Sequence, residues 1–199
     1  TDLFTIDADG KNLVQLTHDE FADMQPQWSP DGTMIAFATD QGPGADLANL
    51  RFPHLQIAIY HVDGGNVELI PGQNGLNINP MWAPDSKSIA FVSDRTGGQN
   101  IFLYDLQEKQ HYQLTNVVGG VISLTEFSPA ITWSHQMDKM AFTYLENGEY
   151  TVWTIDNPRM LKRKPFVPAA AAQMIASRSD SAAAAAHARR SAQRSIPSP

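Results

Sequence analysis

Residues 26–37 read PQWSPDGTMIAF, and the same pattern returns twice further along the chain. Residues 80–91 read PMWAPDSKSIAF and residues 131–142 read ITWSHQMDKMAF, so the copies are spaced by 54 and then 51 residues. In every copy a Trp precedes a Phe by nine positions, and an Ala stands directly before that Phe. Self-similarity at this period predicts a repeat protein in which each unit packs against its neighbours.

The centre of the first copy predicts a tight turn between two strands. Pro30 presets φ for the turn, Asp31 tolerates a bent backbone, and Gly32 accepts a positive φ. Runs of β-branched and aromatic residues alternate with Asp-Gly and Gly-Gly turn signals along residues 1–158. Each copy continues into two more short apolar segments, so each unit is predicted to be a four-stranded antiparallel meander.

Meanders that stack radially form a β-propeller, whose blades number about 4–8. We predict an all-β fold of about three to four blade pieces: a half blade in residues 1–17, whole blades in 26–70 and 80–115, and a piece from 131 to about 166. Residues 160–166 are predicted to form its last outer strand. These pieces do not complete a ring, so we expect an incomplete propeller, part of a longer chain, whose open edges favour self-association.

The residues of the repeated motif are predicted to be structural, because a role in packing or in turns explains their repetition. The aromatic residues are expected to pack between blades, and the Pro and Asp residues to form turns; calcium binding by a ring of turn carboxylates is an alternative. The predicted structural residues are Trp28, Pro30, Asp31, Gly32, Phe37, Trp82, Pro84, Asp85, Phe91, Trp133 and Phe142.

Charge and composition change near residue 158. Residues 1–158 hold six Lys and Arg against twenty Asp and Glu, a net charge of −14, whereas 159–199 hold eight basic residues and one Asp, a net charge of +7. Two Ala runs in the last part favour helix but are too short to be stable alone. We predict a propeller segment over 1–166 and an Ala/Ser/Arg-rich, disordered or weakly helical tail over 167–199. A frameshift product is the alternative for this tail.

Several classes of chemistry lack their motifs in this sequence. The absence of Cys excludes disulfides, Cys-ligated metals and thiol nucleophiles, and neither a Gly-x-Ser-x-Gly elbow, a His-Glu-x-x-His motif nor a phosphate loop is found. The sequence also lacks an unbroken apolar run of about 18 residues and a basic-then-apolar opening. We therefore expect no catalysis, cofactor, metal, nucleic-acid partner, transmembrane segment or signal peptide in this chain.

Two predicted loops are unusually long and apolar, residues 41–54 and 116–129. Loops on repeat scaffolds carry function more often than strands do, and Arg and aromatic residues are common interface anchors. We expect them to contact a partner protein or a neighbouring domain; the alternative is that they cap the blade edges. The candidate contact residues are Leu47, Leu50, Arg51, Phe52, Val121, Ile122 and Phe127.

The motif of residues 26–37, followed by Ile-Tyr, Asp-Gly and Leu-Thr, resembles the WD40-like PD40 repeat of the TolB β-propeller family. The resemblance covers residues 1 to about 158. It implies a non-enzymatic protein-interaction module of the bacterial cell envelope, located in the periplasm. Similar repeats occur in the propellers of dipeptidyl-peptidase and tricorn-type peptidases, so the propeller of a larger peptidase, with its catalytic domain outside this chain, is the alternative. A cation- or glycan-binding propeller is a third possibility.

Overall fold

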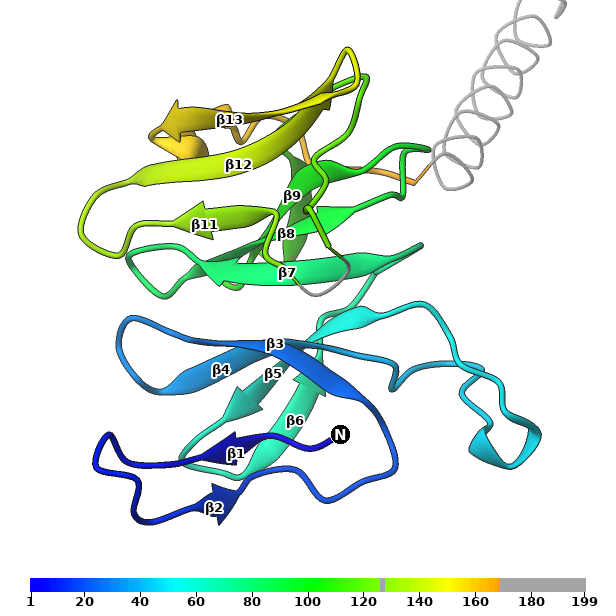
Figure 1. Ribbon diagram of the computed structural model, residues 1–199, viewed down its shortest axis with the longest axis vertical. Coiled ribbons are helices and arrows are strands. Elements are labelled where there is room, and N and C mark those ends of the chain that lie inside the picture. The colour runs from blue at the N-terminus through cyan, green and yellow to red at the C-terminus, as the bar shows by residue number, and fades with distance from the viewer. Residues whose placement is uncertain (126–127, 169–199) are drawn as a thin grey trace, which may run out of the picture. The chain divides into compact units, whose positions relative to one another are not determined.

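A computed structural model describes residues 1–125 and 128–168, so the predicted tail lies almost wholly outside the described residues. The chain divides into two units, residues 1–165 and 166–199. The first unit contains all of the strands that are described. It is an all-β structure of antiparallel sheets, as predicted from the turn signals and the strand-forming residues (Figure 1).

The sheets follow one another along the chain, and the strands of each sheet pair in sequence order. The half blade is formed by β1 (Phe4–Thr5) and β2 (Val14–Gln15). Blade 1 is formed by β3 (Asp23–Trp28), β4 (Met34–Thr39), β5 (Gln56–His61) and β6 (Asn66–Leu69). Blade 2 is formed by β7 (Asn77–Trp82), β8 (Ser88–Ser93), β9 (Asn100–Asp105) and β10 (Gln110–Gln113). Blade 3 is formed by β11 (Ile131–Trp133), β12 (Lys139–Glu146) and β13 (Glu149–Asp156).

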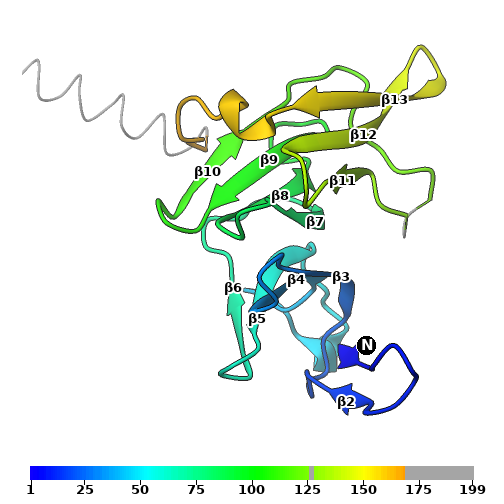
Figure 2. The ribbon, with the colours of Figure 1, turned by 90° about the vertical axis from the view of Figure 1, so that its left-hand side faces the viewer.

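The blades are arranged around their first strands. β7 of blade 2 contacts both β3 of blade 1 and β11 of blade 3, and the two views show these strands lying near one another (Figures 1 and 2). This is the arrangement of a β-propeller, and it confirms the predicted fold class.

A relay of side-chain amides joins the first strands of the three blades. Gln25 and Asn79 occupy equivalent bulges and both have positive φ, of 55° and 52°. The Gln25 Oε1 atom accepts a hydrogen bond from the Asn79 backbone N–H at 2.8 Å, and the Asn79 Oδ1 atom accepts one from the Ala130 N–H at 2.9 Å. Each bulge therefore satisfies a backbone donor of the next blade.

The repeated Trp residues lie on the side of each blade that faces the preceding blade. Trp82 is 1% exposed, and its Nε1–H donates to the Gln27 carbonyl of blade 1 at 3.0 Å. Trp133 is buried in one cluster with Ala90 and Val92 of blade 2. Small residues before each Phe thus provide the surface on which the next indole packs.

Trp28 lies on the corresponding side of blade 1, opposite Ile35, but it is not buried, and the prediction that it is a core residue is wrong. Its side chain is 46% exposed. The half blade contributes Leu3 to a buried cluster with Ile35, Phe37 and Tyr60, which covers the outer part of blade 1. Among the described residues, the half blade has only two strands and lacks a first strand that would cover the indole.

The turn residues bond to their own turns. The Asp31 Oδ1 atom accepts hydrogen bonds from the Ser29 hydroxyl at 2.7 Å and from the Thr33 N–H at 3.1 Å, and these bonds hold the pKa of Asp31 below its usual value. Gly32 has a φ of 73°, and Ser86 occupies the equivalent position in blade 2 with a φ of 58°. The Asp31 carboxylate therefore shapes the turn, as the Pro-Asp-Gly sequence predicts.

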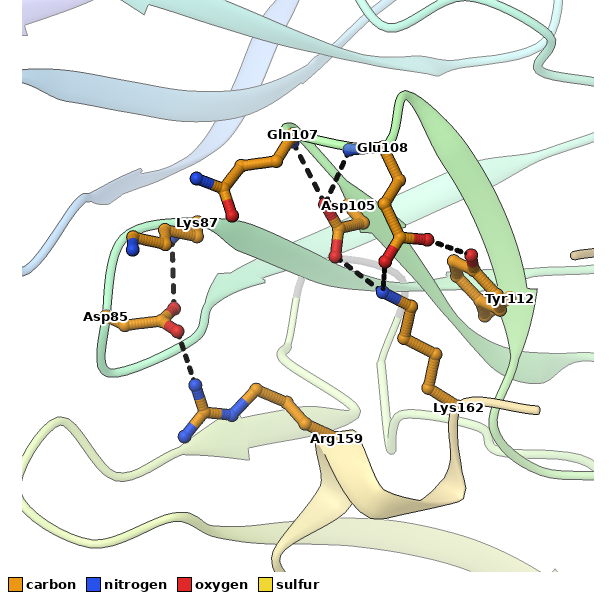
Figure 3. Close-up of polar contacts among 8 residues, drawn as sticks. All are labelled: Asp85, Lys87, Asp105, Gln107, Glu108, Tyr112, Arg159 and Lys162. Atoms are coloured by element: carbon orange, nitrogen blue, oxygen red, sulfur yellow. Dashed lines mark hydrogen bonds and ion pairs between the residues drawn. The ribbon is translucent and has the colours of Figure 1, made fainter. Parts of the chain in front are cut away.

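The segment after β13 is not the outer strand that we predicted for residues 160–166. It forms a short 3₁₀ helix, η2 (Pro158–Leu161), whose Pro at the first turn lacks the N–H that an added strand would need there. Two basic side chains from this segment then reach across to acidic residues of the blades (Figure 3). We call residues 157–162 the strap.

The strap joins blade 3 to blade 2 through ion pairs. Arg159 contacts Asp85 of blade 2 and also Asp138 of blade 3, with its Nη2 atom 2.9 Å from the Asp138 Oδ2 atom. Lys162 contacts Glu108, and its Nζ atom lies 2.7 Å from the Asp105 Oδ2 atom (Figure 3). These partners are 21 to 74 residues apart in the chain, so the ion pairs close long loops.

Burial and ion pairing shift the pKa values of the charged strap residues and their partners in opposite directions. Burial raises the pKa of Asp105, but hydrogen bonds from Lys162 and from the backbone outweigh it and hold the pKa below its usual value. Burial lowers the pKa of Lys162, but its bonds to Asp105 and Glu108 raise that pKa overall. The ionised pair is therefore the stable form of this contact at neutral pH.

Candidate interaction surface

Both long loops leave the blades at the same end (Figure 1). Residues 41–54 connect β4 to β5 in blade 1, and residues 116–129 connect β10 of blade 2 to β11 of blade 3. In these antiparallel blades, the connection from the second to the third strand and the connection from the fourth strand to the next blade both lie at the end of the sheet where β4 and β8 finish. The structure therefore places both predicted loops on one surface, which we call the loop end.

The first loop is closed on itself and presents apolar side chains to solvent. Asp46 caps the short 3₁₀ helix η1 (Leu47–Asn49), and Asp46 and Arg51 exchange two backbone hydrogen bonds of 3.0 and 2.8 Å. Leu50, in the left-handed conformation, is 75% exposed, and Phe52 is 59% exposed. The Arg51 side chain is exposed between them, whereas Leu47 is half-buried.

The second loop divides its apolar residues between core and surface. Val121 is fully buried, its N–H donates to the Gln99 carbonyl at 2.8 Å, and it pairs with Tyr144 of β12. The prediction that Val121 contacts a partner is therefore wrong, because its side chain fills the core between blades 2 and 3. Ile122 is half-buried, and Phe127 lies outside the described residues.

Two exposed residues of this loop were missed by the sequence reasoning, Val118 and Leu124. Gly119 lies so close to β12 that a Cβ atom there would be 1.8 Å from the Leu145 carbonyl oxygen. Its lack of a side chain lets the chain approach β12, while the neighbouring Val118 faces solvent. The Gly119-Gly120 pair in the sequence was the available signal, since paired Gly residues mark close backbone approach.

A repeated Asp supports the connections at the loop end, and the sequence reasoning missed it as well. The Asp40 Oδ1 atom accepts a hydrogen bond from the Ala22 N–H at 2.7 Å, and the Asp94 Oδ1 atom accepts one from the Leu76 N–H at 2.8 Å. Each Asp stands three residues after the repeated Phe. Leu145 holds this position in blade 3 and makes only a backbone bond there, from its N–H to the Gly120 carbonyl, whereas Asp40 and Asp94 make both a backbone and a side-chain bond.

A half-buried cation, Arg95, lies at the loop end of blade 2. The Arg95 guanidinium donates to the Asn77 side chain at 2.7 Å and to the Ser93 hydroxyl at 3.0 Å, and it lies 4.7 Å from the centre of the Phe102 ring. Burial lowers the pKa of Arg95 to about 10, so the group stays charged at neutral pH. These contacts indicate that Arg95 orders the ends of β7 and β8.

The titratable residues do not form a metal-binding cluster in the part of the chain that the structure describes. No group of three or more His, Asp or Glu side chains lies close enough there to hold a metal ion. His111 is buried with its Nε2–H donating to the Pro71 carbonyl at 2.7 Å, and burial lowers its pKa to about 4. Over the same described ranges, we find no helix with the length and apolar content to span a membrane.

Comparison with known proteins points to TolB. The chain matches no protein-family model. It is 27% identical to a TolB homolog of Chlorobium luteolum, over 53% of this chain and 31% of the relative, and 28% identical to the Tol-Pal system protein TolB of Gluconobacter oxydans, over 60% and 24%. The chain therefore spans less than a third of the length of these relatives.

The chain is also similar to peptidases. The chain is 28% identical to the uncharacterized peptidase YuxL of Bacillus subtilis, over 53% of this chain and 15% of the relative.

Solved structures of both kinds of protein superimpose on the chain. A putative TolB structure from Agrobacterium tumefaciens superimposes with a TM-score of 0.59 at 18% identity, covering 79% of this chain and 53% of that one. A Mycobacterium tuberculosis puromycin-hydrolyzing peptidase gives 0.54 at 18% identity, covering 78% and 23%. Together with the repeated Trp and Asp-Gly motifs, these similarities show that the described chain is a partial, TolB-like β-propeller with repeats of the PD40 type.

Proposed function

We propose that this chain is a non-enzymatic, TolB-like propeller module that binds a protein in the periplasm of the bacterial cell envelope, or a neighbouring domain of its own chain. The observation that carries the proposal is the exposed set Leu50, Arg51 and Phe52 on a loop that is closed by its own backbone bonds. An Arg between two exposed apolar side chains has the composition of an interface anchor. Because the loop is preorganised, binding would cost little ordering entropy.

The test uses purified Pal, since relatives of the chain are named as parts of a Tol-Pal system. The double variant R51A/F52A removes two anchor side chains and leaves the backbone bonds of the loop in place. Leu13→Ala is the matched control, because Leu13 is an equally exposed apolar residue outside the loop end.

We expect the full chain and L13A to bind Pal with the same affinity in calorimetry, and R51A/F52A to bind at least about tenfold more weakly. Equal affinities for all three proteins would refute the role of this loop. The absence of binding by the unaltered chain would refute Pal as the partner.

The propeller of a larger peptidase is the second candidate function. Its support is the similarity to YuxL and to the M. tuberculosis enzyme. In that case, the loop end would face a catalytic domain of dipeptidyl-peptidase or tricorn type outside this chain. The coding DNA on either side distinguishes the two functions: an in-frame serine-hydrolase domain would support the peptidase, and a Tol-type domain would support the interaction module.

A further inference from the structure

The loop of residues 41–54 contains a carboxylate that is placed to pair with Arg51 but does not do so. Asp46 and Arg51 lie directly opposite each other in an antiparallel bridge, where facing side chains extend to the same side of the backbone. Both oxygens of the Asp46 carboxylate are bonded elsewhere. Its Oδ1 atom accepts a hydrogen bond from the Asn49 N–H at 3.2 Å, and its Oδ2 atom accepts one from the Asn49 side-chain amide at 2.7 Å.

The cap of η1 therefore occupies this carboxylate, and the guanidinium opposite it stays free of it. Arg51 makes no ion pair with any residue that the structure describes. Its side chain is exposed, and its backbone is fixed by the two hydrogen bonds to Asp46. The loop thus holds one cation in a set position without neutralising it.

The residues on both sides of Arg51 are apolar and exposed. Leu50 is 75% exposed and Phe52 is 59% exposed. Leu50 ends η1 with a φ of 52°, a conformation that is usually left to Gly because it costs other residues free energy. The exposed Leu side chain buries little surface within the chain that would offset this cost. Strain of this kind is common at binding sites, and it indicates that Leu50 is kept for a contact outside the chain.

Exposed positive charge is scarce at the loop end. Residues 1–158 contain six Lys and Arg in all. Four of them lie in or beside the hairpins at the opposite end of the blades: Lys11, Lys87, Lys109 and Lys139. Arg95 lies at the loop end, but it is half-buried and bonded to Asn77. Arg51 is therefore the exposed Lys or Arg that residues 1–158 contribute to the loop end.

We propose that the partner of the loop end presents a carboxylate to Arg51, as an Asp or Glu side chain between apolar residues that cover Leu50 and Phe52. This inference rests on the proposed function, because it names the chemistry that the same loop would recognise. Arg can donate two parallel N–H bonds to one carboxylate, and such bidentate pairs are strong and directional. Apolar neighbours that exclude water around the pair strengthen it further.

The charge of the propeller makes this contact selective. Residues 1–158 have a net charge of −14, so an acidic partner is repelled over most of their surface. Arg51 provides a place at the loop end where a carboxylate is attracted, and it therefore determines how the partner is oriented. Leu50 and Phe52 supply apolar contact that salt does not screen.

The test selects peptides from a random phage-displayed library on the full chain. Only clones that fail to bind R51A/F52A are kept, so that every peptide compared binds this loop. Their affinities are then measured for Arg51→Lys, Arg51→Gln and Arg51→Glu. Lys87→Glu is the matched control, because it makes the same charge reversal at an exposed residue of the opposite end. Arg51 and Lys87 are both exposed, so all variants are expected to fold, which circular dichroism checks.

We expect the selected peptides to share an Asp or Glu between apolar residues. They should bind K87E as they bind the unaltered chain, but bind R51Q about tenfold and R51E at least about a hundredfold more weakly. R51K should lie between R51Q and the unaltered chain, because it keeps the charge and loses the bidentate geometry.

Two results would overturn the inference. Loop-binding peptides that lack Asp and Glu and bind R51E as tightly as the unaltered chain would show that the loop recognises apolar groups alone, which leaves the proposed function in place. A selection that yields no peptide dependent on the loop would overturn it as well. The calorimetry with Pal does not depend on either result, so it decides the proposed function separately.

Discussion

Replacing Asn79 tests whether the amide relay holds the blades together. The Asn79 Oδ1 atom is the partner of the Ala130 N–H, and Ala130 is buried. Asn79→Gly removes this acceptor and keeps a residue that adopts the φ of 52° without strain. Leaving the buried N–H without a bond should lower the free energy of unfolding by about 1–3 kcal/mol.

Asn79→Ala removes the same acceptor and also places a Cβ-bearing residue without a local hydrogen bond in the left-handed region. That conformation costs about 1–2 kcal/mol, partly offset because Ala loses less backbone entropy on folding than Gly does. We therefore expect N79A to be about 1 kcal/mol less stable than N79G. The measurement is urea unfolding followed by circular dichroism at one protein concentration, so that self-association does not contribute.

The reasoning makes two separable claims about Asn79. A Gly variant as stable as the unaltered chain would show that the hydrogen bond to blade 3 contributes nothing. Equal stability of N79A and N79G would show that the left-handed backbone at this position carries no cost. Gln25→Ala is a second check, since it removes the acceptor of the Asn79 N–H in blade 1.

Two further predictions concern titratable groups. Burial lowers the pKa of His111 to about 4, so its contribution to stability is fully present above the unfolded pKa of about 6.5 and is lost as the pH falls from 6.5 to 4. The free energy of unfolding should therefore drop by about 3 kcal/mol over that range, and by less in H111Q. Denaturation at several pH values measures the difference. Lys162→Met should lower the free energy of unfolding by about 1 kcal/mol at pH 7. The pKa of Asp105 is lowered, so the stability that the strap ion pair contributes is present above about pH 3.9 and is lost as the pH falls below it. If K162M unfolds in acid at the same pH as the unaltered chain, the strap does not have this role.

The strands and turns could be predicted because their signals are local. The Pro-Asp-Gly turn of residues 30–32 and its copy near Asp85 determine where the chain reverses, and their spacing defines the repeat. The resulting sheets β3–β6 and β7–β10 are the predicted four-stranded meanders. The two long loops could also be located, because their length departs from the repeat.

The burial of individual residues could not be predicted in the same way. Trp28 and Trp82 lie in similar local sequences, PQWSPDG and PMWAPDS, but differ in the strands that cover them. Val121 and Val118 belong to one apolar loop, and the close approach of Gly119 to β12 decides which of the two enters the core. The sequence reasoning therefore located the two long loops, but it placed Val121, which is buried, at the surface.

The amino-acid sequence by itself determined the turn positions and the all-β architecture, because these depend on residues close together in the chain, and it determined the repeat, because one short motif recurs at spacings of 54 and 51 residues. The tertiary structure alone decided which repeated Trp is exposed, how the Asn79 amide reaches the next blade, and that residues 157–162 form a strap and not a strand. Those features depend on contacts such as that of Arg159 with Asp85, 74 residues away. Local preference does not specify contacts over such separations, because they form only when the packed blades bring the groups together.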